Sequence, residues 1–241
     1  MPVLVVAATG LELRAALHVG EAAPQGEIVE LSAFGRPVLA LVCGIGVVNA
    51  ALALGRALQR ADVAGVLNLG VAGSFDLAAH PLGGVRLVEA ETWPEFGLLF
   101  SGQCAADARG LGFALNGAAV GDPDAIFERL AWDAPAELAR LGLAAGGFAR
   151  AESLTVSGVS ADPQRALALA ARFGAGLENM EGFALGYAAR LSGLPFAQLR
   201  AVSNAVGARP PHCWDLPGAL AALGLAAQQL LAPQAGSAHR P

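Results

Sequence analysis

Two short polar segments combine carboxylate, amide and guanidinium groups at places where a protein could use them. Glu178-Asn179-Met180-Glu181-Gly182 opens an apolar run typical of a helix, and Arg200-Ala201-Val202-Ser203-Asn204 follows eighteen residues later, ending a stretch typical of a strand. Strand ends in α/β proteins border the crevice in which ligands bind. A carboxylate and an amide brought to one crevice could hold a sugar hydroxyl and a heterocyclic base.

The hydrophobic pattern predicts the elements that position these groups. We expect strands over 3–8, 27–33, 37–42, 64–69, 85–90, 152–156 and 196–202, and helices over 11–17, 47–59, 163–173, 181–192 and 216–231. The Gly- and Ala-rich stretch 91–147 is harder to interpret, with a loop over 91–97 and short helices over 124–130 and 135–141. Strands this apolar are covered on both faces. The prediction is a single α/β domain over 1–232, with a mixed, twisted central sheet flanked by helices, and a disordered tail over 233–241.

Composition excludes several classes of protein. The 241 residues are 55% hydrophobic and only 15% charged, with a net charge of -5, so no basic face for nucleic acid is expected. No apolar run reaches the ~18 residues of a membrane span. Residues 1–8 lack the basic start and cleavage pattern of a signal peptide, so we expect a cytoplasmic protein. All 15 basic residues are arginine, which excludes a P-loop lysine and a Schiff-base lysine.

Neither a metal site nor a cofactor site is indicated. Cys43, Cys104 and Cys213 are widely spaced, and the histidines lack metal-ligand spacing. His212-Cys213-Trp214 has no partner pattern that would support a metal or a nucleophile. We therefore expect no cofactor and no metal.

Two glycine segments follow predicted strands. Gly44-x-Gly46-x-x-Asn49 resembles a dinucleotide fingerprint without its third glycine, but Asp62 precedes the next strand, whereas the ribose-binding acid of such sites ends one. A tight strand-to-helix turn is the better interpretation. Gly70-Val71-Ala72-Gly73 is either an ordinary turn or a place where a flat ligand approaches the backbone.

The carboxylates also admit two interpretations each. Glu12, just past the first strand, is either a solvated acid in a helical first turn or a base at the crevice. Glu181 could simply start its helix, and Glu178 favours a structural or solvated role. Ser203 and Asn204 could merely cap the strand exit. The balance shifts because Glu12, Ala72, Glu181 and Asn204 should fall at one edge of the sheet.

Taken together, these segments resemble the purine nucleosidase branch of the nucleoside phosphorylase superfamily. The sequence is similar to the 5′-methylthioadenosine/S-adenosylhomocysteine nucleosidases over most of its length. The matching segments are Glu12, Gly44 to Ala51, Asn68 to Gly73, Asn179 to Gly182 and Arg200 to Asn204.

The resemblance implies a role for each matching residue. Glu12 takes the place of the general base that activates water, and Arg200 that of an arginine that helps to place this water. Met180 and Glu181 fall at the ribose site. The purine site is implied for Ala72, Gly73, Thr155, Val156, Ser203 and Asn204. The family also implies a homodimer that binds a small nucleoside.

Asn204 departs from the aspartate that is usual in this family. An asparagine cannot act as an acid, but its NH₂ group donates hydrogen bonds. That suits a 6-oxopurine, whose carbonyl and adjacent ring nitrogen are acceptors, better than a 6-aminopurine. The asparagine and the run Asn-Met-Glu-Gly also resemble the futalosine hydrolases, a family that releases hypoxanthine in the alternative menaquinone pathway.

The expected chemistry is hydrolysis of an N-glycosidic bond without a cofactor, with Glu12, Arg200 and Asn204 as catalytic residues. The stretch 91–147 could make room for the acyl-benzoate of futalosine, and Arg109 or Arg209 could meet its carboxylate. Three alternatives stay open: a methylthioadenosine-type nucleosidase, a phosphorolytic enzyme and an inactive purine-binding protein. The phosphorolytic alternative lacks the Gly-Asp-Pro-x-Arg segment typical of that branch.

Overall fold

The computed structural model describes residues 1–144, 146–208 and 214–233. Arg209, His212 and Cys213, and the predicted tail beyond residue 233, lie outside the described residues. The expectations attached to them therefore stay predictions.

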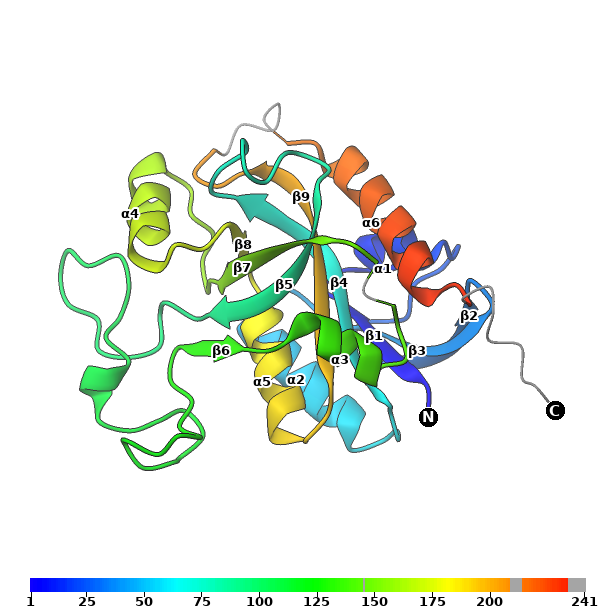
Figure 1. Ribbon diagram of the computed structural model, residues 1–241, viewed down its shortest axis with the longest axis horizontal. Helices are drawn as coiled ribbons and strands as arrows, with labels where there is room; N and C mark the ends of the chain where they lie inside the picture. Colours follow the sequence, from blue (N-terminus) through cyan, green and yellow to red (C-terminus); the bar gives the residue numbers. More distant parts are fainter. Residues whose placement is uncertain (145, 209–213, 234–241) are drawn as a thin grey trace.

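Strands and helices alternate along most of the chain, as predicted (Figure 1). The strands are β1 (Val3–Ala7), β2 (Ile28–Ala33), β3 (Arg36–Val42), β4 (Gly65–Ser74), β5 (Val85–Thr92), β6 (Arg129–Ala131), β7 (Ala149–Thr155), β8 (Leu177–Asn179) and β9 (Phe196–Ala205). The α-helices are α1 (Gly10–Leu17), α2 (Val47–Leu58), α3 (Ala134–Arg140), α4 (Pro163–Phe173), α5 (Gly182–Leu191) and α6 (Leu216–Leu231), with a 3-10 turn at Arg109–Leu111.

The sheet is mixed and partly closed on itself. Its order is β2-β3-β1-β4-β8-β7-β5-β6, and β9 pairs with both β4 and β5. The β4–β9 and β1–β4 pairs are parallel, whereas β5–β9 and β4–β8 are antiparallel. Because β9 joins β4 to β5, the strands β4, β9, β5, β7 and β8 form a closed ring of pairings. The mixed α/β fold class predicted from the sequence is confirmed.

Helices cover both faces of the sheet. One core cluster packs residues of α1, α3 and α6 against β1, β3 and β9, and the other packs α2 and α5 against β1 and β4. Figure 1 shows α1 with α6 on one side of the strands and α2 with α5 on the other.

Local sequence signals explain where several helices begin. Thr9 and Glu12 form a reciprocal capping box at the start of α1. Asp162 caps α4 through the backbone N–H of Arg165, ahead of a proline at the first turn, as predicted. Asp215 caps α6 in the same way.

Four interpretations of local structure were wrong, and two short strands were missed. Residues 124–130 form no helix, because turns lead directly into β6. Glu91 and Thr92 belong to β5 and not to a loop, and β8 was missed. Gly70 to Gly73 continues β4, and Ser203 and Asn204 continue β9, because these two strands pair in parallel as far as Ser74 and Ala205.

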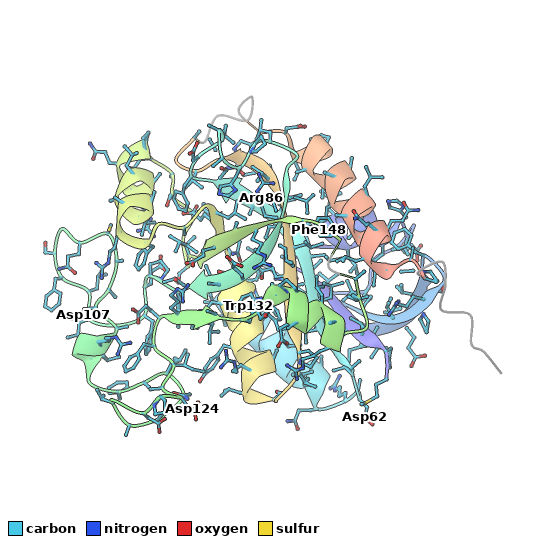
Figure 2. All side chains as sticks on the ribbon, in the orientation of Figure 1. Asp62, Arg86, Asp107, Asp124, Trp132 and Phe148 are labelled. Atoms are coloured by element: carbon cyan, nitrogen blue, oxygen red, sulfur yellow. The ribbon has the colours of Figure 1, made fainter. Side chains whose placement is uncertain are left out.

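Residues 93–128, between β5 and β6, extend away from the sheet and are called the peripheral excursion below (Figure 1). Figure 2 places Asp107 and Asp124 on this peripheral part, and Asp62 at the rim of the molecule near the end of α2. Asp62 lies between α2 and β4 and not at a strand's carboxyl end. This position agrees with the rejection of a dinucleotide site. No helix among the described residues is both long and apolar enough to cross a membrane.

Candidate active site

The backbone of β4 brings the first two candidate residues together. Glu12 Oε1 accepts a hydrogen bond from Val71 N at 3.0 Å, and Arg200 Nη1 donates to Val71 O at 3.4 Å. A Cβ on Gly70 would collide with Arg200 Nη1 and would lie 3.0 Å from Glu12 Oε1. Glycine at this point therefore permits a close approach of side chains to the strand, which excludes the interpretation of the segment as an ordinary turn.

Glu12 is buried, with 6% of its surface exposed. Its Oε2 accepts from Thr9 N at 2.9 Å and from Thr9 Oγ1 at 2.7 Å. The capping box thus fixes one carboxylate oxygen and aims the other at β4. The alternative of a solvated first-turn acid is wrong.

Glu181 lies across from Glu12 at the start of α5, where it is the N-cap residue but makes no side-chain cap. Its Oε1 accepts from Gly46 N at 3.0 Å, and its Oε2 lies 3.7 Å from Arg200 Nη2. Gly46 has a φ of 90°, a conformation that glycine adopts without strain. The turn after β3 therefore serves to present a backbone N–H to Glu181.

Burial is the largest cause of the pKa shifts of Glu181 and Cys43 in this site. Burial raises the pKa of Glu181, the charge of Arg200 opposes this shift, and the charge of Glu12 adds to it. Burial likewise raises the pKa of the nearby Cys43 thiol to about 12, helped by the charge of Glu181. Cys43 therefore stays a neutral thiol near pH 7 and is no nucleophile.

Arg200 is the positive centre between the carboxylates, with 1% of its side chain exposed. Its Nη2 donates to Asn179 Oδ1 at 3.1 Å. Its buried Nε has no hydrogen-bond partner in the described part of the chain. A buried donor without a partner is costly, so this N–H is a polar group that the described protein contacts do not satisfy.

Asn204 lies along the same pair of strands, opposite Gly73. Its Oδ1 accepts from Ser203 Oγ at 2.8 Å, and its Nδ2 donates to Ala205 O at 2.9 Å. The Ser203 hydroxyl therefore orients the amide, leaving one N–H of the NH₂ group unused by these contacts. A Cβ on Gly73 would lie 3.1 Å from Nδ2, so glycine keeps this region open.

The remaining predicted site residues gather beside the ring of strands. Met180 packs, half-buried, against a cluster that contains Val156. Thr155 is buried, and its Oγ1 bonds to Glu91 and accepts from Phe183 N, so its side chain serves the fold. Ala72 lies in an apolar cluster to which each strand of the closed ring contributes one buried residue. The binding roles of these residues stay predictions.

The structure also places Glu178 and Arg109, two further residues named from the sequence. Glu178 is buried and accepts from Ser160 N at 3.0 Å and Oγ at 2.6 Å, which supports its structural role. The guanidinium of Arg109 lies over the Phe127 ring, 4.6 Å from its centroid, in the peripheral excursion. No group of three or more potential metal ligands occurs among the described residues.

Sequence reasoning missed a buried polar network below the site. Asn179 and Gln198 both donate to the Glu91 carboxylate, and Asn68 donates in turn to Gln198 Oε1. The available signal was an acid, an asparagine and a glutamine inside or next to apolar strands, where a polar residue needs partners.

Comparisons with known proteins agree with this architecture. The phosphorylase superfamily model matches residues 2–92 and 142–232. The chain is 41% identical to the futalosine hydrolase of Thermus thermophilus, over 83% of this chain and 84% of that protein. It is 32% identical to the futalosine hydrolase of Acidothermus cellulolyticus, over 75% and 69%.

Solved structures share the fold at lower identity. The 5′-methylthioadenosine/S-adenosylhomocysteine nucleosidase of Helicobacter pylori superimposes with a TM-score of 0.70 at 18% identity, covering 94% of this chain and 95% of that one. A futalosine hydrolase mutant of the same species gives a TM-score of 0.69 at 18% identity, covering 95% and 98%. The unmatched residues 93–141 in the family model contain the peripheral excursion. The chain therefore belongs to the phosphorylase superfamily and, within it, to the futalosine hydrolase family.

Proposed function

We propose that this protein hydrolyses the N-glycosidic bond of futalosine and releases hypoxanthine, a step of menaquinone biosynthesis by the futalosine route. The observation that carries the proposal is the meeting of Glu12 and Arg200 at the backbone of Val71, with Glu181 3.7 Å from the guanidinium. Asn204 lies along the same two strands. Similarity to curated futalosine hydrolases supports the choice of substrate.

Each of the four side chains has its own role in the proposed reaction. Glu12 takes a proton from water as the water oxygen bonds to the anomeric carbon, and the carbon–nitrogen bond breaks with its electron pair leaving on the purine. Glu181 holds the ribose hydroxyls, and Arg200 orients the water. Asn204 donates a hydrogen bond to the departing base, which takes its proton from solvent. Catalysis comes from positioning and charge stabilisation, with no cofactor.

Asn204 favours an oxopurine because its amide is held with the NH₂ group facing away from Ser203. In Asn204→Asp the side chain becomes acceptor-only, so we expect the preference for oxopurine over aminopurine nucleosides to fall about tenfold. The ratio of kcat/KM values for inosine and methylthioadenosine measures this change. An unaltered ratio would place specificity elsewhere.

The acyl-benzoate of futalosine needs room beside the ribose. A cavity of about 390 Å³ begins at Val47, next to Gly46, and its wall includes Trp93, Leu115, Phe183 and Tyr187. Trp93 and Leu115 come from the stretch 91–147, which the sequence suggested for this purpose. An aromatic ring would fit such an apolar wall. We assign the acyl-benzoate to this cavity, and Arg109 and Arg209 stay candidates for its carboxylate.

The predicted homodimer is supported by an apolar surface on α2 and α5. Val48 and Leu52 on α2, and Leu191 on α5, have 75%, 59% and 58% of their surfaces exposed. Contiguous exposed apolar residues of this kind mark interaction sites. We expect the wild type to sediment as a dimer and Leu52→Asp to shift it towards monomer; Leu52, unlike Val48 and Leu191, does not line the cavity of about 390 Å³. Leu225→Asp, at a similarly exposed position on α6, is the control and should leave the dimer intact. A monomeric wild type would contradict the assignment of this surface to a dimer.

The cytoplasmic location stays a prediction.

The proposed function is tested with purified protein, without phosphate, on futalosine, inosine and methylthioadenosine. We expect free hypoxanthine from futalosine as the preferred reaction. Adenine release without turnover of futalosine would favour the methylthioadenosine-type alternative, and no turnover at all would favour an inactive binding protein. The sequence contains no Gly-Asp-Pro-x-Arg segment of the phosphorylase type, so phosphate should not stimulate the reaction.

A further inference from the structure

Glu91 is a fully buried carboxylate that the proposed reaction does not use. Its Oε1 accepts from Asn179 Nδ2 at 2.7 Å and from Gln198 Nε2 at 2.6 Å, and its Oε2 accepts from Thr155 Oγ1 at 2.7 Å. The three donors come from β8, β9 and β7, so the carboxylate ties together most of the closed ring of strands. Every one of these contacts requires Glu91 to accept.

The donors around Glu91 are all satisfied when the carboxylate accepts. Thr155 Oγ1 accepts from Phe183 N at 2.7 Å, and of the two acceptors near its hydroxyl Glu91 Oε2, at 2.7 Å, is closer than Asn179 Oδ1, at 3.5 Å. Burial raises the pKa of Glu91, but the charge of Arg200 and the three hydrogen bonds oppose this shift. The donor arrangement is satisfied by the carboxylate form.

Asn179 transmits the orientation set by Glu91 to the active site. Its Nδ2 faces Glu91 and Ser153 Oγ, at 2.7 Å and 2.8 Å. Its Oδ1 accepts hydrogen bonds from Glu181 N at 2.9 Å, Gly182 N at 2.8 Å and Arg200 Nη2 at 3.1 Å, and a long one from Thr155 Oγ1 at 3.5 Å. A flipped amide would press its NH₂ group against three donors, so only one orientation is compatible with the site.

Gly182 shows how closely this network supports the start of α5. A Cβ on Gly182 would collide with the Glu91 carboxylate, so only glycine lets the helix begin there. The negative charge also lies where a helix N-terminus favours it. Glu181, the residue just before Gly182, is therefore fixed in place by the same carboxylate.

We propose that Glu91 is a positioning residue: it locks the Asn179 amide, and Asn179 then holds the Arg200 guanidinium and the backbone of Glu181 in their working geometry. Glu91 touches no substrate and acts through Asn179. The kinetic part of this proposal rests on the proposed function.

The first test is Glu91→Gln, which keeps the volume but brings an NH₂ group among three donors. We expect kcat for futalosine to fall about 10- to 100-fold, since small displacements of catalytic groups cost this much. Glu178→Gln is the matched control. It removes a buried carboxylate one residue before Asn179 that contacts Ser160 and not Arg200, so kcat should stay within about twofold.

The second test separates positioning from general damage to the fold. Asn179→Asp alone sets two carboxylates face to face and should lower kcat in the same way. In the double variant Glu91→Gln/Asn179→Asp, the amide introduced at position 91 donates to one oxygen of the carboxylate introduced at position 179. The other oxygen of that carboxylate still accepts from Arg200 and the two backbone N–H groups. We expect kcat to recover at least about tenfold over either single variant, because the donor and acceptor between positions 91 and 179 match again. Recovery should be incomplete, because Gln198 Nε2, which donates to the same Glu91 oxygen in the wild type, then faces the introduced amide.

Two results would overturn the proposal: Glu91→Gln with kcat within twofold of wild type, or a folded double variant no better than the worse single one. Crystal structures of the wild type and Glu91→Gln provide a readout independent of substrate. We expect the contact between Asn179 Oδ1 and Arg200 Nη2 to be lost in the variant, and its retention would also contradict the proposal. Absence of futalosine turnover by the wild type would instead reject the proposed function, leaving this structural readout to decide the role of Glu91.

Discussion

Replacing Glu12 with glutamine is expected to lower kcat for futalosine about 10²- to 10⁴-fold, the usual contribution of a positioned general base. Glutamine retains an oxygen that could accept from Val71 N, but an amide cannot take a proton from water. Ligand binding should persist, because Glu12 is not assigned to hold the sugar or the base. Steady-state kinetics and calorimetric binding of hypoxanthine measure the two effects separately.

Thr9→Ala is the control for the structural role of Glu12 in the capping box. This variant removes the hydroxyl of the capping box and leaves the carboxylate. It should cost about 0.5–2 kcal/mol of stability while kcat falls far less than in Glu12→Gln. Turnover of Glu12→Gln close to wild type would remove Glu12 from its role as the base.

The second large effect is expected for Glu181→Gln. The glutamine oxygen could still accept from Gly46 N, but its NH₂ group would face Arg200 Nη2, where Oε2 lies at 3.7 Å in the wild type. Loss of the charged acceptor for the ribose hydroxyls should reduce kcat/KM about 10²-fold, because hydrogen bonds to a charged group contribute about 1.5–3 kcal/mol. A reduction below about threefold would mean that Glu181 does not hold the ribose.

The raised pKa of Glu181 leads to an expected dependence of activity on pH. Burial raises the pKa of Glu181, so the carboxylate takes up a proton at a higher pH than an ordinary glutamate, for which the value is about 4.3. The active, ionised form is therefore lost as pH falls through this raised pKa. We expect the acidic limb of the kcat/KM profile to lie above the ordinary glutamate range, and to change in Glu181→Gln.

Much of this architecture follows from short-range signals. Asp162 and the proline after it predict the start of α4, and the apolar run 216–231 predicts α6. The juxtaposition of Glu12 with Arg200 follows from topology, because they lie on or after strands that run parallel on either side of β4. The residue types near the strand ends predicted that Glu12, Ala72, Glu181 and Asn204 share one edge of the sheet, whereas the place of Arg200 beside the water was implied by the family resemblance.

The buried network could not be predicted in the same way. Glu91 precedes Trp93-Pro94, a combination that indicates a loop, and its strand character comes from pairing with β7 and β6. β8 is only three residues long, too short for a periodic pattern, yet it carries Asn179 into the ring. These positions depend on contacts between residues far apart in sequence, in particular the pairing of β9 with both β4 and β5.

The central claim, that water activated at Glu12 cleaves the bond between sugar and base, is tested most directly by turnover of futalosine at increasing phosphate concentrations, with the sugar product identified by ³¹P NMR and mass spectrometry. The account predicts free hypoxanthine and an unphosphorylated sugar, formed at a rate independent of phosphate. A phosphate-dependent rate with a sugar 1-phosphate as product would contradict it.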